Sequence, residues 1–471
     1  MSPTLVVALA LIAVPLLSIA AIRWQRGLVM ALPFFAILNG LAVPVGASSI
    51  RVDQLAACLL LAPLAASVLI GARRLRADST AWMLVAVLAI NVIASAVNSP
   101  APSYSLLQCV NLATVWVIYF VIINFLDTRE QAERFLRRCV QAAIIASAIG
   151  IGAYVLAIAG FDAGGAEVSK ASIEHLTKAY GAYGAMVEPN IFGSFTAAHL
   201  VLAIALLTLV ARTPSPAIPA RMLTWLAALS AIGLLLSFTR AAWLGAAAGA
   251  VLYLLLGGRA LGFRVRLPRL LIQLTLGSLV VVIVALAAGS GGTQLRLKLL
   301  NLVNLESPTA ALRLASYAVA LQQVLGHPIM GSGTYSFAAL VAGGADFQHF
   351  DGWRNLWIGD YLLLALHDTG IIGLIAWLGL LWTSLAGGVR AARATRETDP
   401  FLAGRAIALT AAVATLLIPY LATTGFSLGF TWVLIGLLGV YRRLSIAAPA
   451  PAPLPRPIPQ EGLTSPQPLP Q

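Results

Sequence analysis

Hydrophobic residues in this chain come in blocks of roughly 20 residues, separated by short segments that carry most of the charges. A helix needs about 20 apolar residues to cross the hydrocarbon core of a bilayer. The blocks therefore predict an all-α, polytopic helical membrane protein with about 12–13 transmembrane helices. The predicted spans are residues 4–22, 27–47, 52–72, 80–98, 104–126, 139–160, 189–211, 222–238, 241–257, 270–290, 361–388, 403–423 and 425–441.

The composition agrees with this pattern. Of the 471 residues, 60% are hydrophobic and 10% are charged, whereas about 25% of the residues in soluble proteins are charged. This balance excludes a water-soluble enzyme, a disordered chain and a disulfide-stapled secreted scaffold. The three cysteines lie in or beside apolar blocks and have no metal-ligand spacing, so we interpret them as core residues.

The formal net charge of +13 is unevenly divided between the predicted loops. Alternate loops place 22 of the 30 lysines and arginines on one face of the membrane. Seven acids on that face reduce its net charge to +15, whereas the eight cations and ten acids of the opposite face give −2. The positive-inside rule makes the first face cytoplasmic. Most of the charge is thus an insertion signal, and no nucleic-acid partner is expected.

Two segments on the opposite, outer face are too long to be turns, and loops of this length in compact proteins are usually functional. Residues 308–325 in the longer segment have a helical pattern. The predicted organisation is N-terminal transmembrane helices in 1–160, a small outer loop in 161–188, central transmembrane helices in 189–290, a large, partly helical outer loop in 291–360, C-terminal transmembrane helices in 361–441, and a Pro-rich disordered cytoplasmic tail in 442–471.

Two arginines on the outer face are candidates for chemistry. Arg240 lies at the junction of two apolar blocks, where an arginine is costly unless its head reaches water or meets an anion. It is either an interfacial anchor or a guanidinium that binds phosphate through its planar fork. Arg313 lies on an amphipathic stretch that leads into a proline turn and a Gly-rich loop at 326–333. It is either a solvated charge on a surface helix or part of a site.

Acidic residues open two of the predicted spans. Glu188 and Asn190 flank a proline at the start of one span, and Asp360 precedes another. Both patterns are typical of helix capping. His367 and Asp368 lie about two turns further into the second span, where polar residues are costly and often functional.

Four short motifs, taken in order, resemble the O-antigen ligase and O-antigen polymerase superfamily of bacterial inner-membrane glycosyltransferases. They are Glu-Pro-Asn-Ile-Phe-Gly at 188–193, Ser-Phe-Thr-Arg at 237–240, the stretch from Arg313 to the His-Pro-x-x-Gly-x-Gly that ends at 333, and Asp-Thr-Gly-Ile-Ile-Gly at 368–373.

The resemblance implies an inverting transfer of a glycan from undecaprenyl pyrophosphate to an acceptor hydroxyl at the periplasmic side of the bacterial inner (cytoplasmic) membrane. The acceptor is lipid A–core, or a related surface glycan, for a ligase of lipopolysaccharide biosynthesis, and a second lipid-linked glycan for an O-antigen or exopolysaccharide repeat-unit polymerase. Membrane lipids are the other expected partners. The resemblance also implies that Arg240 and Arg313 hold the donor pyrophosphate.

Neither a cofactor nor a metal is expected, because guanidinium groups can neutralise the charge that a divalent ion neutralises elsewhere. We predict supporting roles at this site for Glu188, Asn190, Arg354 and Asp368.

The chain departs from the family at one position. The family commonly has a His-Asn pair at the start of the span that ends in Thr-Gly-x-x-Gly, and its histidine is the usual candidate for activating the acceptor. Residues 359–360 are Gly-Asp here. The general base is therefore Asp360 or His349, with His367 behind them because it lies deeper in the membrane, unless the reaction needs little base assistance.

Two other classes of function compete with the glycosyltransferase. A transporter or flippase for an anionic lipid or solute usually has internal repeats and polar residues at the midplane. This chain shows no repeat, and its periplasmic cations lie at the surface and in the large loop. A passive scaffold would not require Arg240 at a membrane edge.

Overall fold

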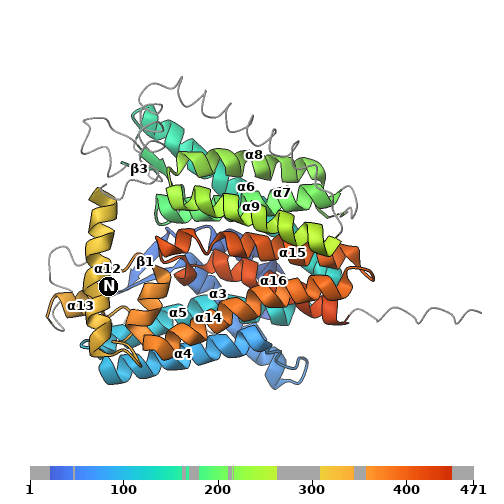
Figure 1. The fold of residues 1–471 in the computed structure, drawn as a ribbon. Helices are drawn as coiled ribbons and strands as arrows, with labels where there is room; N and C mark the ends of the chain where they lie inside the picture. Colours follow the sequence, from blue (N-terminus) through green and yellow to red (C-terminus); the bar gives the residue numbers. More distant parts are fainter. Residues whose placement is uncertain are drawn as a thin grey trace, which may run out of the picture.

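The computed structural model describes residues 22–45, 48–161, 166–168, 180–210, 215, 217–261, 308–343 and 357–447. Most of these residues lie in long helices that run side by side (Figure 1). The helices are α2 (Gln25–Ala36), α3 (Val52–Leu69), α4 (Ser79–Asn98), α5 (Pro102–Phe125), α6 (Arg129–Ile158), α7 (Pro189–Val210), α8 (Ala220–Leu236), α9 (Arg240–Leu261), α12 (Pro308–Gly326), α13 (Phe337–Val341), α14 (Tyr361–Thr395), α15 (Pro400–Thr415) and α16 (Gly429–Ala447), with short 3₁₀ turns η4 (Pro419–Leu421) and η5 (Gly425–Ser427).

The strands form two small antiparallel hairpins. One pairs β1 (Ala42–Val45) with β2 (Ser48–Arg51), and the other pairs β3 (Ala166–Val168) with β4 (Tyr180–Ala182). These hairpins lie at one end of the helices and contribute no layer to the fold (Figure 1). The predicted all-α class is therefore confirmed.

Nine helical segments among the described residues are long and apolar enough to cross a membrane. They are α3, α4, α5, α6, α7, α9, α14, α15 extended through η4, and α16. The apolar helix α8 is shorter, with 17 residues. The prediction of a polytopic helical membrane protein is confirmed, while the predicted spans at 4–22 and 270–290 lie outside the described residues apart from Ile22.

Residues 27–47 do not form the single span that their hydrophobicity predicts. Helix α2 has 12 residues, and such a helix is only about 18 Å long. The side chain of Asn39 donates to the carbonyl oxygen of Ala36 at 3.0 Å and so occupies an acceptor at the helix end. Gly40 then donates its N–H to Ala185 at 2.9 Å. The chain leaves the helix because it pairs with a distant segment, which hydrophobic periodicity does not reveal.

Helices α7, α15 and α16 form the centre of the bundle. In the apolar stretch of each of these helices, 72%, 83% and 78% is buried inside the protein, whereas the other membrane-length helices are 28–50% buried. Small residues dominate the enclosed surface of α15, and small side chains allow close approach of helices where no hydrophobic effect drives them together.

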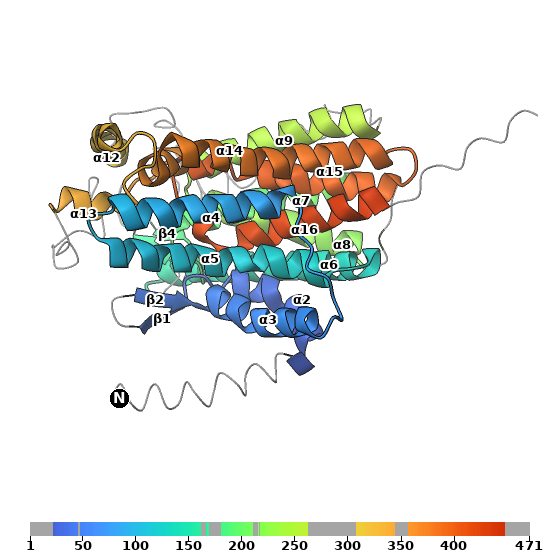
Figure 2. The ribbon, with the colours of Figure 1, turned by 90° about the horizontal axis from the view of Figure 1, so that it is seen from below.

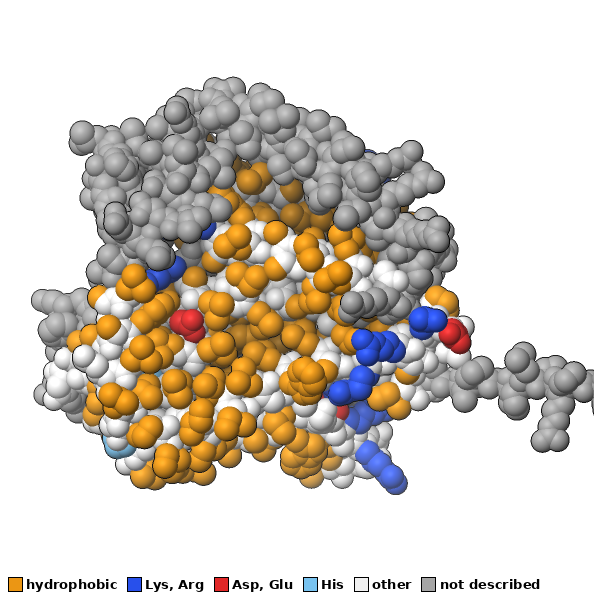
Figure 3. Space-filling model, in the orientation of Figure 1, with side chains coloured by type: hydrophobic (Ala, Val, Ile, Leu, Met, Phe, Trp, Pro, Cys, Tyr) orange, Lys and Arg blue, Asp and Glu red, His pale blue; other side chains and the backbone are white. Residues whose placement is uncertain are grey.

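The two ends of the bundle differ in charge. Figure 3 shows most of the lysines and arginines on the visible face at the end where α4 and α6 begin, which we call the basic end. Several arginines of the basic end form ion pairs with acids. Among these pairs are Arg73–Asp127 at 2.8 Å, Arg129–Asp399 at 3.1 Å, Arg405–Glu133 at 3.1 Å and Arg442–Asp78.

The opposite end carries the two hairpins and α12, and we call it the α12 end. Helix α12 lies crosswise to the bundle in Figure 1 and is seen end-on in Figure 2. It therefore runs across the end of the bundle instead of being inserted among the spanning helices.

Candidate active site at the α12 end

The position of Arg240 is fixed by contacts between α7 and the junction of α8 with α9. Arg240 is the first residue of α9, and the hydroxyl of Thr239 before it donates to the carbonyl oxygen of Pro189 at 3.1 Å. A Cβ atom at Gly193 would lie 2.7 Å from the Ser237 hydroxyl. The motif at 188–193 is thus packed against the motif at 237–240, and only glycine at position 193 permits this close approach.

The turn before Arg240 is backbone-strained. Phe238 has φ 52°, a left-handed conformation that is rare for a bulky residue. Its side chain is buried, with 7% exposed, so packing holds this turn in place. As a result, the half-buried Arg240 side chain starts from a well-defined backbone.

Glu188 and Asn190 lie on the same junction. Glu188 accepts a hydrogen bond from the Thr423 hydroxyl at 2.9 Å, which ties the start of α7 to the segment between α15 and α16. The side-chain oxygen of Asn190 lies 3.5 Å from the Thr239 hydroxyl. Glu188 therefore links α7 to that segment, and Asn190 lies beside the residue that precedes Arg240.

Helix α12 brings Arg313 to Arg240. The predicted helix at 308–325 matches α12 closely, and Arg313 is half-buried on it. The charges of the two arginines are close enough to repel each other. Two cations from separate helices thus share one location at the α12 end.

Tyr317 lies near both Arg313 and the start of α14. It follows Arg313 by one helical turn, so the two side chains share a face of α12. Its hydroxyl lies 3.4 Å from where a Cβ of Gly359 would stand and donates to the carbonyl oxygen of Leu421 at 3.4 Å. Burial raises the pKa of Tyr317, while the Arg313 charge lowers it and the Asp360 carboxylate raises it.

Asp360 caps α14. Its Oδ1 accepts from the backbone N–H of Leu363 at 2.9 Å, and the side chain is half-buried. The carboxylate is close enough to Tyr317 to act on its ionisation. Asp360 therefore combines a capping role with a place near Tyr317, which is also near Arg313.

His367 and Asp368 lie deeper and are both buried, with 0% and 4% exposed. Nδ1 of His367 lies 2.8 Å from Oδ1 of Asp368, and Nε2 lies 2.8 Å from Oε1 of Gln323. Both ring nitrogens are therefore engaged. This geometry favours a structural role for His367 over that of a base facing a substrate.

The Gly-rich loop after α12 docks on α14 beside this histidine. Ser332 and Gly333 donate their N–H groups to the carbonyl oxygens of His367 and Asp368, at 2.8 and 2.9 Å. Helix α14 is kinked at this point, because Gly370 has φ 63° and ψ −166°. The His-Pro-x-x-Gly-x-Gly motif that ends at 333 and the motif at 368–373 are therefore joined by backbone hydrogen bonds.

His349 and Arg354 lie outside the described residues, so their predicted roles remain predictions. The other predicted residues form two groups. Arg240, Arg313, Asp360, Glu188 and Asn190 lie around the ends of α7, α9, α12 and α14, whereas His367 and Asp368 lie within the junction of α12 with α14.

Two residues at the site, Tyr317 and Gln323, were not selected from the sequence. Tyr317 could have been found from its spacing of four residues from Arg313. Gln323 gave no such signal, because its partner lies on another helix.

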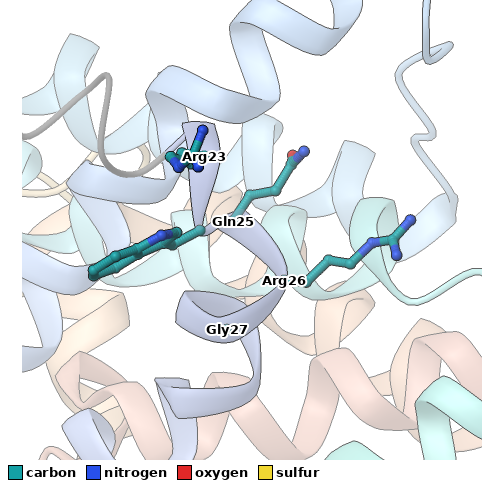
Figure 4. Close-up of a pocket in the computed structure, with 5 residues that line it drawn as sticks. Arg23, Gln25, Arg26 and Gly27 are labelled. Atoms are coloured by element: carbon teal, nitrogen blue, oxygen red, sulfur yellow. The ribbon is translucent and has the colours of Figure 1, made fainter.

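A separate surface hollow of about 460 Å³ lies at the basic end, where α2 begins. It is lined by Arg23, Trp24, Gln25, Arg26 and Gly27 (Figure 4). All five residues come from one short stretch, and the two arginine side chains extend in different directions (Figure 4). The hollow therefore lacks the convergent polar groups of a binding site.

The α12 end is chemically suited to a polyanion. Two guanidinium groups can each bind phosphate oxygens bidentately, and a tyrosine hydroxyl and a carboxylate lie beside them. No cluster of metal ligands occurs among the described side chains.

Part of this region matches a known protein family. Residues 225–378 match the family model described as O-antigen ligase (Wzy_C). The match runs from α8 into α14 and includes both arginines and Asp360. A search of curated proteins found no match.

Proposed function

We propose that this chain, of which residues 225–378 match the O-antigen ligase family model, is a membrane glycosyltransferase that moves a glycan from undecaprenyl pyrophosphate to an acceptor hydroxyl on the periplasmic side of the inner membrane. The acceptor is lipid A–core or a related surface glycan. The observation that carries this proposal is the convergence of Arg240 and Arg313 at the α12 end.

Like charges held together favour an anionic ligand. Repulsion between two guanidinium groups costs free energy, most of all where the surroundings are poorly solvated. A pyrophosphate between them converts this repulsion into two attractive, bidentate contacts. The pair therefore binds a dianionic or trianionic group better than a single charge does.

The arginines also serve the chemical step. The acceptor oxygen attacks the anomeric carbon, a new C–O bond forms with inversion, and the bond from this carbon to the pyrophosphate oxygen breaks. Negative charge grows on the departing pyrophosphate, so guanidinium groups already in place stabilise the transition state more than the ground state. The acceptor proton goes to a base, for which Asp360 and His349 are the leading candidates.

The surrounding contacts support this assignment. Thr239 and Gly193 fix the backbone before Arg240, and α12 carries Arg313 across the end of the bundle. Tyr317 presents its hydroxyl beside Arg313. Because its pKa is raised, the hydroxyl stays protonated at neutral pH, and it can donate to an anionic oxygen in place of the Leu421 carbonyl.

The glycan profile of a deletion strain tests the proposal. Lipid-linked polymer that accumulates while polymer disappears from lipid A–core is the result expected for a ligase. A single repeat unit on the core assigns the repeat-unit polymerase reaction of the same superfamily. Surface and lipid-linked glycans identical to the parent strain would overturn the proposed function.

A further inference from the structure

A chain of buried polar contacts joins α12 to α14, and the transfer proposed above does not use it. This series of contacts begins at Gln323 on α12, whose Oε1 lies 2.8 Å from Nε2 of His367. Nδ1 of His367 continues it to Oδ1 of Asp368 at 2.8 Å. The other carboxylate oxygen of Asp368 accepts from the backbone N–H of Tyr335 at 2.8 Å.

These contacts need an explanation because buried polar groups are costly. His367 is fully buried and Asp368 nearly so, and a buried polar side chain is tolerated only when its hydrogen bonds are made. Apolar residues would fill the same space at less cost, so a satisfied polar chain here favours one particular arrangement of the helices.

The backbone reinforces the same junction. Helix α12 ends at Gly326, and the following loop bonds to α14 on both sides of the kink. Ile371 donates its N–H to Pro328 at 2.9 Å, in addition to the bonds from Ser332 and Gly333. A Cβ at Gly331 would lie 2.3 Å from the backbone nitrogen of Thr369, which shows how closely the loop fits.

The junction therefore determines where the rest of α12 lies. Arg313 precedes Gln323 by ten residues on the same helix, a distance of about 15 Å along the axis. Because α12 crosses the ends of the spanning helices (Figure 1), its attachment to α14 restricts its direction. A small rotation at Gln323 would displace Arg313 from Arg240.

We propose that Gln323 and His367 are positioning residues that hold α12 at the angle at which Arg313 meets Arg240. This inference rests on the proposed function, because it assigns to the junction the task of completing the donor site. Asp368 fixes the His367 ring, and Gln323 transmits that orientation to the helix.

The test is a double-mutant cycle on donor affinity. Undecaprenyl pyrophosphate is titrated into the purified full-length protein in nanodiscs, with Gln323→Leu made in the wild-type and in the Arg313→Ala background. In the wild-type background, loss of the hydrogen bond lowers affinity about tenfold. In the Arg313→Ala background, Gln323→Leu has no further effect, because the residue on which it acts is gone.

Gln322→Leu is the matched control, since Gln322 is the exposed neighbour on the same helix and should keep wild-type affinity. Gln323→Leu is also expected to raise KM for a lipid-linked donor, whereas a loss of folded enzyme alone would lower kcat and leave KM unchanged.

Each result decides a separate point. The positioning role is overturned if Gln323→Leu leaves affinity unchanged, or if it lowers affinity by the same factor in both backgrounds. If Arg313→Ala alone binds the donor as tightly as wild type, the proposed donor site itself is wrong.

Discussion

Asp360 combines two tasks that substitution can separate. As the N-cap of α14 it accepts from Leu363, and asparagine caps a helix about as well as aspartate. As a base it needs a carboxylate, which asparagine lacks. Asp360→Asn is therefore expected to keep the thermal stability of the protein while transfer falls by about 10²-fold or more.

The comparison variant is His349→Ala, assayed with the same lipid-linked donor. Wild-type transfer by Asp360→Asn together with loss in His349→Ala would assign the base to His349. Wild-type transfer by both variants would contradict base catalysis by either residue.

The ionisation of Tyr317 gives a second prediction for a single residue. Burial and the Asp360 carboxylate raise the pKa of this phenol above its model-compound value of 10.0, against the lowering effect of Arg313. Raising the pH through 7 to 9 should therefore leave the hydroxyl protonated. The absorbance difference at alkaline pH between wild type and Tyr317→Phe measures this titration, and a midpoint below pH 10 would contradict the predicted environment.

At the scale of elements, the kink of α14 is the feature on which the junction depends. Gly370 has a backbone conformation that is essentially restricted to glycine, and a Cβ there would lie 2.3 Å from the carbonyl carbon of Ile329. Gly370→Ala is expected to lower the free energy of unfolding by about 1–3 kcal/mol from backbone strain alone.

Thermal unfolding in detergent measures the effect, and Gly379→Ala on the same helix is the control. Gly379 has ordinary helical geometry, and the nearest atom to its Cβ position is the flexible Met83 sulfur at 3.3 Å. Equal stability of the two variants would contradict the strained kink.

The elements also show what hydrophobic patterning can predict. It located α5 within a few residues, as 104–126 against Pro102–Phe125, because one long apolar block has one possible structure in a membrane. It failed at 27–47, where hydrogen bonds from Asn39 and Gly40 end the helix. Hydrogen bonds to distant segments decide such cases, and the local pattern does not contain them.

The same distinction applies to the candidate site. The sequence selected Arg240 because it lies at the junction of two apolar blocks. It selected Arg313 because a proline turn and a Gly-rich loop follow it, and Asp360 because it stands where the related family has a His-Asn pair. Gln323 did not stand out, since glutamine is ordinary on a surface helix, and its role depends on His367 of another helix. The sequence therefore selected the charged residues of the candidate site, while the contacts around them required the structure.

At the scale of the whole molecule, the charge asymmetry predicts which end faces the cytoplasm. Arginines gather at the basic end (Figure 3), so the α12 end should face the periplasm. In a variant with the three native cysteines replaced by serine, His327→Cys should react with a membrane-impermeant maleimide applied to cells with a permeabilised outer membrane. Glu397→Cys should react only after the inner membrane is also permeabilised.

Both probe positions are exposed in the structure, so accessibility alone does not distinguish them. The opposite labelling pattern would contradict both the orientation and a periplasmic active site.

The central claim is that Arg240 and Arg313 together hold the donor pyrophosphate without a metal. The most direct measurement is the rate of glycan transfer from a lipid-linked donor by the purified protein in EDTA. Arg240→Ala and Arg313→Ala should each lose about 10²–10³-fold in rate, while Arg390→Ala, which removes an exposed arginine at the basic end, should match wild type. Wild-type rates in either site variant, or loss of the wild-type activity in EDTA, would contradict the account.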